Sequence, residues 1–132
     1  MKILVDADAL VALAKDDDTN HNRAVKIAKA LKRETLYVTP LTIPEAATVL
    51  SYRVSQKSAQ QFLKETRQRR LIELPLMTQA SLLADEIFLK QNKKGISWID
   101  CLNVAMIKIH NLDGIFSFDS FYQKFGLLTS IK

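Results

Sequence analysis

The stretch ILVDADALVAL, residues 3–13, places two aspartates directly after a short apolar run. The run itself, KILVD at 2–6, is continuous rather than alternating, which is typical of a strand covered on both faces. The residues that follow, 7–15, favour a helix. Asp6 and Asp8 therefore stand where a buried strand passes into a helix. Three roles are open to them: nucleophile and acid of a phosphatase, ligands of a metal ion, or turn former and helix cap.

The same change from apolar run to helical pattern recurs along the chain. Helices are expected over 7–15, 19–33, 42–53, 55–70, 78–92 (with Thr78 as its cap) and 97–111. Strands are expected over 2–6, 35–40, 71–74 and 114–119, with 126–131 as a fifth candidate. Strands that alternate with helices predict an α/β fold. We expect a three-layer α/β/α architecture around a mainly parallel sheet of four to five strands. The length of 132 residues suits a single domain over 1–132.

The composition excludes several classes of protein. Hydrophobic residues make up 48% and charged residues 25%, which argues against disorder. No uncharged apolar run approaches the roughly 18 residues of a membrane span, and the N-terminal run is too short for a secretory signal. The single cysteine, Cys101, excludes an internal disulfide and a cysteine-cluster zinc site, and it is expected to be a small buried thiol. These features predict a cytoplasmic protein with no membrane contact.

The charge balance is compatible with a polyanionic partner. Nineteen Lys and Arg residues against fourteen Asp and Glu give a net charge of +5. Positive charge gathers in KETRQRR at 64–70 and in KQNKK at 90–94. Each segment is read equally well as a solvated helix face.

Four acids stand at the junctions between elements. Asp6 and Asp119 follow expected strands, whereas Glu45 and Asp100 lie in the first turns of expected helices. Because ligands bind beyond the carboxyl ends of parallel strands, we expect all four to meet in one cleft. Taken singly, Glu45 is explained by a capping box with Thr42, and Asp100 by one with Ser97. Asp119 and Asp8 are likewise explained as caps.

If the four acids meet in one cleft, capping alone no longer explains them. Two carboxylates about 4 Å apart repel by about 4 kcal/mol at an effective dielectric constant of about 20, so they must bind protons or share a cation. Oxygen ligands favour Mg²⁺ or Mn²⁺ over zinc. Such an ion polarises a phosphoryl oxygen and activates a bound water. An acidic cleft in a basic protein therefore indicates metal-dependent cleavage of a phosphodiester.

The acidic segments also resemble a known family. ILVDADALVAL, TPLTIPEAATVL, SWIDCLNVAMIKIHN and DGIFSFDSFYQKFG are similar, in this order, to the four acidic motifs of PIN domains. The resemblance covers essentially the whole chain. DDDTNHNRAVKIA, at 16–28, is similar to the start of the second helix in the toxin-type, VapC-like branch.

The resemblance implies an endoribonuclease that depends on Mg²⁺ or Mn²⁺. The residues that match the metal-binding acids of the family are Asp6, Glu45, Asp100 and Asp119. Ser117 stands where the family commonly has Thr or Ser, and it is expected to orient Asp119, a water or a phosphate. Asp8 replaces the more usual small hydroxyl residue. It is read as a further metal ligand acting through water, an acid behind the ligands, or a helix cap.

The VapC-like resemblance also implies partners. It implies the toxin of a type II toxin–antitoxin pair, with RNA as substrate, a cognate antitoxin protein that blocks the cleft, and a homodimer. Lys94 and the cluster at 67–70 are expected to hold the RNA backbone.

Two alternatives stay open. One is a catalytically silent PIN-like module that only binds RNA or protein. The other is a haloacid-dehalogenase-type phosphatase, whose Asp-x-Asp motif matches Asp6 and Asp8 as nucleophile and general acid. Thr39 and Lys94 would then serve the phosphate, but the final acidic pair of that family is missing.

Overall fold

Four parallel strands form the central sheet of the computed structural model, which describes residues 1–127. In chain order they are β1 (Lys2–Val5), β2 (Thr35–Val38), β3 (Leu71–Glu73) and β4 (Gly114–Phe116). They lie in the order β3-β2-β1-β4, and each neighbouring pair is parallel, which confirms the expected sheet. The segment 128–131 of the fifth candidate strand lies outside the described residues.

Helices occupy the connections between the strands. They are α1 (Ala7–Ala14), α2 (His21–Ala30), α3 (Thr42–Arg53), α4 (Gln56–Arg67), α5 (Thr78–Leu89) and α6 (Trp98–His110), followed by the 3-10 helix η1 (Ser120–Phe125). Each of the six helices expected from the sequence is present. Within residues 1–127 no helix is both long enough and apolar enough to cross a membrane.

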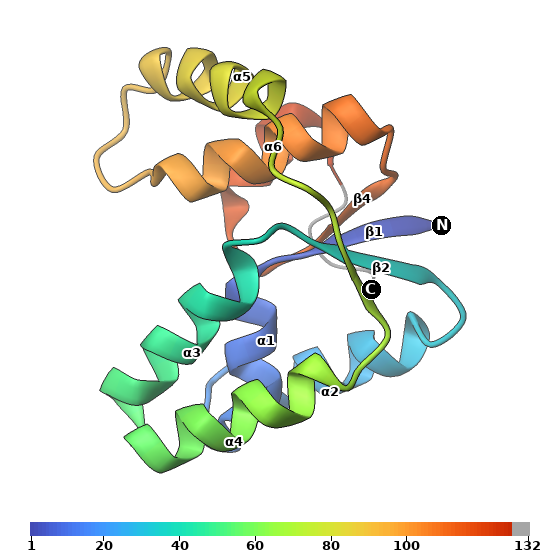
Figure 1. Ribbon diagram of the computed structural model, residues 1–132, viewed down its shortest axis with the longest axis vertical. Helices are drawn as coiled ribbons and strands as arrows, with labels where there is room; N and C mark the ends of the chain where they lie inside the picture. Colours follow the sequence, from blue (N-terminus) through green and yellow to red (C-terminus); the bar gives the residue numbers. More distant parts are fainter. Residues whose placement is uncertain (128–132) are drawn as a thin grey trace.

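The helices cover both faces of the sheet, as Figure 1 shows. Ile3 and Val5 of β1 pack into a core with α1, α2, α3 and α4. Leu4, which points to the other face, packs with α5, α6 and η1. Because both faces are buried, the strand has no polar alternation, and the three-layer α/β/α prediction is confirmed.

The order in which strands are added to the sheet reverses beside β1. The chain places β2 and β3 on one side of β1, and then crosses over to place β4 on the other side. A parallel sheet binds its ligands at such a reversal, beyond the carboxyl ends of the two strands. The loops that follow β1 and β4 carry Asp6 and Asp119, so these two acids lie at the reversal.

Two of the expected helix caps were wrong, and all four strands end one to three residues earlier than expected. Leu41, not Thr42, is the N-cap of α3, and the Thr42 hydroxyl instead accepts from the backbone N–H of Thr39 at 3.1 Å. Met77 is the N-cap of α5, so Thr78 is already its first residue. The strand expected at 114–119 ends at Phe116. The capping box of α6, with Ser97 and Asp100, is confirmed.

Ser97, which caps α6, and Thr78, the first residue of α5, give a matched test of capping. Ser97→Ala removes the hydroxyl that accepts from the backbone N–H of Asp100, so we expect a loss of about 1 kcal/mol in the free energy of unfolding. Thr78→Ala removes no cap, and its cost should stay within about 0.5 kcal/mol. Urea denaturation of both variants measures this. Equal losses would contradict the assignment of the caps.

Candidate active site

An acidic hollow of about 320 Å³ opens beyond the carboxyl end of β1. Its acidic lining residues are Asp6, Asp8, Asp18, Glu45, Asp100 and Asp119. They come from the starts of α1, α3 and α6, from the loop after α1, and from the residue before η1. The hollow therefore gathers five of the six residues expected at the site. The sixth, Ser117, is fully buried and bonds to two of them.

Asp6 is the most enclosed of these acids, with 6% of its surface exposed. Its Oδ1 accepts from the backbone N–H of Ala7 at 2.8 Å and from Asn103 Nδ2 at 3.1 Å. Its Oδ2 accepts from Ser117 Oγ at 2.9 Å and from the Tyr122 hydroxyl at 3.0 Å. Four donors thus fill the acceptor positions of one carboxylate, which is what a buried charge requires.

Asn103 and Tyr122 belong to the site although the sequence analysis did not select them. Both side chains are buried, and Asn103 donates to the Tyr122 hydroxyl at 2.9 Å. One signal was present: Asn103 is the one polar residue in the apolar run 101–107 of α6. Asp18 was also missed. Its carboxylate lines the hollow while accepting from the backbone N–H of Asn20 at 2.8 Å.

Two hydroxyl groups are each shared by two carboxylates. Ser117 Oγ lies 2.9 Å from Asp6 Oδ2 and 3.2 Å from Asp8 Oδ2. The Tyr122 hydroxyl lies 3.0 Å from Asp6 Oδ2 and 3.3 Å from Asp100 Oδ1. A hydroxyl carries one proton, so these four contacts have only two hydroxyl protons between them. The other two contacts require protonated carboxyls or a neighbouring positive charge.

Asp8 bridges α1 to the loop after β4. Its Oδ2 accepts from the backbone N–H of Phe118 at 3.0 Å, in addition to the Ser117 contact. Its Oδ1 is buried and has no hydrogen-bond partner among the described residues. Asp8 is not the helix cap that was considered for it, because Asp6 is the N-cap of α1. Burial, followed by the charge of Asp6, raises the pKa of Asp8 to about 7.

The same causes act on the neighbouring acids. Burial is the main reason why the pKa of Asp6 is raised, and the nearby charge of Asp100 adds to it. Burial also raises the pKa of Asp100, with a further contribution from Asp119. For Glu45, burial and the charges of Asp6 and Asp100 raise the pKa to about 7. At neutral pH the cluster therefore holds protons unless a cation replaces them.

The donor set fits a hard divalent cation. The hollow offers carboxylate oxygens, which Mg²⁺ and Mn²⁺ prefer, and one of its carboxylates, Asp8, has a buried Oδ1 that no donor among residues 1–127 satisfies. Within residues 1–127, no three acidic, imidazole or thiol groups are close enough to ligate one ion together. Mg²⁺ typically takes one or two carboxylates directly and keeps several waters, so the arrangement suits this mode of binding.

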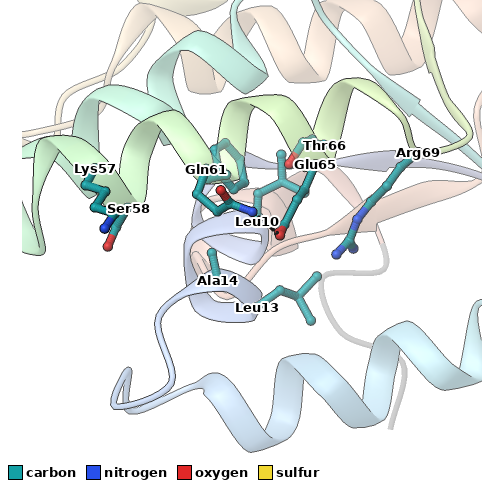
Figure 2. Close-up of a pocket in the computed structure, with 10 residues that line it drawn as sticks. Leu10, Leu13, Ala14, Lys57, Ser58, Gln61, Glu65, Thr66 and Arg69 are labelled. Carbon is teal, nitrogen blue, oxygen red and sulfur yellow. Dashed lines mark hydrogen bonds between the residues drawn. The ribbon is translucent and has the colours of Figure 1, made fainter.

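The basic residues expected to hold RNA lie in two different hollows. Lys94 lines a hollow that also contains Asp100 and Asp119. Arg69, from the cluster at 67–70, lines a different cavity of about 510 Å³ between α1 and α4. Figure 2 shows Arg69 there, near Leu10 and Leu13. That cluster therefore does not border the acids.

Comparison with known proteins gives one family and one fold. Residues 3–126 match the family model described as PIN domain. No curated protein matches the chain. The crystal structure of Mycobacterium tuberculosis VapC20, described as a sarcin–ricin loop cleaving toxin, has a TM-score of 0.85 at 17% identity and covers 96% of each chain. VapBC2 from Rickettsia felis, bound to a DNA fragment from its promoter, has a TM-score of 0.71 at 14% identity, covering 94% of this chain and 92% of that one.

The raised pKa values predict how stability depends on pH. The folded protein binds more protons than the unfolded chain between the ordinary carboxyl pKa values, 3.8 and 4.5, and the raised ones near 7. In metal-free buffer the free energy of unfolding should therefore fall as the pH rises from about 5 to about 8. Urea denaturation at a series of pH values in EDTA measures this.

Two variants test which carboxylates cause the decline in the free energy of unfolding between pH 5 and 8. Asp8→Asn removes one buried charge, so it should flatten the decline and raise stability at pH 8, on the order of 1 kcal/mol for each pKa unit relieved. The control is Asp17→Asn, since Lys15 lowers the pKa of this exposed aspartate. It should leave the decline between pH 5 and 8 in place. A flat wild-type profile over this range would refute the proton-holding cluster.

Proposed function

The chain belongs to the PIN domain family, and from this we propose that it is a ribonuclease that uses Mg²⁺ or Mn²⁺ to hydrolyse internal phosphodiester bonds of RNA. One observation carries the proposal. The carboxylates that line the hollow share two hydroxyl protons among four contacts, and a divalent cation would supply the missing positive charge. Such a cluster is costly to bury, so a purely structural role explains it poorly.

Five carboxylates that line the hollow and were selected from the sequence are proposed to hold the hydrated cation, one or two of them directly and the others through its water molecules. They are Asp6, Asp8, Glu45, Asp100 and Asp119. A cation held by these residues would supply a water molecule of lowered pKa and positive charge for the phosphoryl oxygens. Ser117 and Tyr122 orient the carboxylates, because each hydroxyl bridges two of them. In the metal-free protein, burial and the charges of Asp6 and Asp100 raise the pKa of Glu45 to about 7, and a bound cation would favour its ionised form.

We further propose that the protein is the toxin of a type II toxin–antitoxin pair, with a cognate antitoxin as partner. The likeness in fold to VapC20, named as a toxin, and to VapBC2 supports this. The sarcin–ricin loop is named as the target of VapC20 only. An antitoxin gene in the adjacent open reading frame would support the pairing.

The two alternatives fare differently. A haloacid-dehalogenase-type phosphatase would need Thr39 at the phosphate. This residue is fully buried, and its hydroxyl lies 3.2 Å from that of Thr42. Thr39 does not line the acidic hollow, so the phosphatase loses its candidate. A silent RNA-binding module would keep the same fold, and cleavage assays separate it from the nuclease.

The central prediction concerns Asp100. Asp100→Asn keeps the size of the side chain and removes one proposed ligand, so cleavage of labelled RNA with Mg²⁺ or Mn²⁺ should be abolished. The free energy of unfolding should stay within about 1 kcal/mol of the wild type. EDTA should stop the wild-type enzyme, and either metal should restore it.

The matched control for Asp100 is Asp16→Asn. The Asp16 side chain is 97% exposed and lies outside the hollow, so this variant should cleave as the wild type does. Cleavage by Asp100→Asn at the wild-type rate would refute its role as a ligand. RNA binding without cleavage by the wild type would favour the silent module, and release of phosphate from a small phosphoester would favour the phosphatase.

We also propose a homodimer, for which α5 offers an apolar surface. Leu82 and Leu89 on this helix are 62% and 83% exposed, and a second copy would cover them. Light scattering should give the mass of a dimer, and the double variant Leu82→Lys/Leu89→Lys should give a monomer. A dimer that survives this double change would place the interface elsewhere.

A further inference from the structure

A second hollow, of about 390 Å³, adjoins the acidic one. Asp100 and Asp119 line both hollows, so they form the wall between them. The second hollow carries three lysines: Lys93 and Lys94, from the loop that precedes α6, and Lys124, from η1. Positive charge is therefore concentrated immediately beside the proposed reaction centre, on the side of α6 and η1.

Lys124 is exposed but has partners within the fold. Its Nζ donates to Gln91 Oε1 and lies 5.0 Å from the centre of the Phe121 ring and 5.4 Å from that of Phe125. Gln91 is fixed in turn, because its Nε2 donates to the carbonyl of Ile87, in the last turn of α5, at 2.8 Å. A side chain ordered in this way loses less freedom when it binds an anion.

The three lysines have no carboxylate partner within salt-bridge distance among residues 1–127. Lys90, close to them in sequence, does pair with Glu86. The loop also contains Gly95, whose φ of +93° only a glycine adopts easily. Since no carboxylate of the described residues neutralises them, the charges of Lys93, Lys94 and Lys124 are free to attract an anion, and they lie beside the wall formed by Asp100 and Asp119.

We propose that Lys93, Lys94 and Lys124 form a phosphate subsite that binds the RNA backbone next to the bond to be cut. The inference rests on the proposed ribonuclease activity. An RNA strand must cross carboxylates that repel its phosphates, and the lysines offset this repulsion on one side. Arg53, two turns of α3 beyond Glu45, lines the acidic hollow but not the second one. A strand held at both places lies across the acids.

The test compares two variants with the same change in charge. One is Lys93→Gln/Lys94→Gln/Lys124→Gln. The other is Lys26→Gln/Lys29→Gln/Lys64→Gln, whose residues are exposed and line neither hollow. RNA binding is measured by fluorescence anisotropy in EDTA at several salt concentrations, so that cleavage does not interfere. Thermal unfolding verifies that each variant is folded.

The subsite variant should bind about tenfold more weakly at moderate salt. The slope of log K against log salt should become less steep by about 2, since each phosphate contact to single-stranded RNA contributes about 0.7. The control should change binding by less than about threefold. Gln91→Met removes no charge but frees Lys124, so it should weaken binding by a smaller factor without changing the slope.

Cleavage with Mg²⁺ or Mn²⁺ separates the two proposals. If the subsite variant binds and cleaves RNA like the wild type, the subsite is wrong and the ribonuclease stands. If the lysines control binding while the wild type cleaves nothing, the subsite stands and the ribonuclease fails. Equal losses in both charge variants would show a diffuse attraction and overturn the subsite.

Discussion

The buried Asp6 carboxylate is the interaction on which the rest of the site depends. It caps α1, which follows β1, and it accepts from side chains of α6, of η1 and of the loop after β4. These segments lie about 100 residues from it in the chain. Removing a carboxylate from water is expensive, and the four donors around Asp6 offset part of that cost. The requirement fixes where each of these segments can lie.

The burial of Asp6 also places several carboxylates close together with too few protons between them. Asp6 leaves Ser117 and Tyr122 with one proton each to share with a second carboxylate, Asp8 or Asp100. Packing that favoured folding alone would replace such groups with apolar side chains of similar size. The repulsion between these carboxylates is greatest at the edge of the sheet where the strand order reverses, which is where α/β proteins bind ligands. Stability and the proposed chemistry therefore compete at these residues.

Much of the fold was predictable because its signals are local. The continuous apolar runs at 2–6 and 114–116 follow from burial on both faces of the sheet, and the six helices follow from their periodicity. The acids at element junctions were also visible, since a parallel sheet brings its carboxyl ends together. The errors arose where backbone geometry decides. Thr42 and Thr78 are residue types that often cap helices, but each is already the first residue of its helix, and the cap lies one residue earlier.

The sequence by itself determined the succession of strands and helices along the chain and the acids that stand at their junctions. Both depend on residues that are neighbours in the chain. The tertiary structure alone decided which atoms of those acids meet. Asn103 and Tyr122 reach Asp6 only because α6 and η1 pack on the face of the sheet opposite α1. The three lysines likewise come together only because η1 folds back beside the end of α5. Contacts between distant segments depend on packing, and no local pattern encodes them.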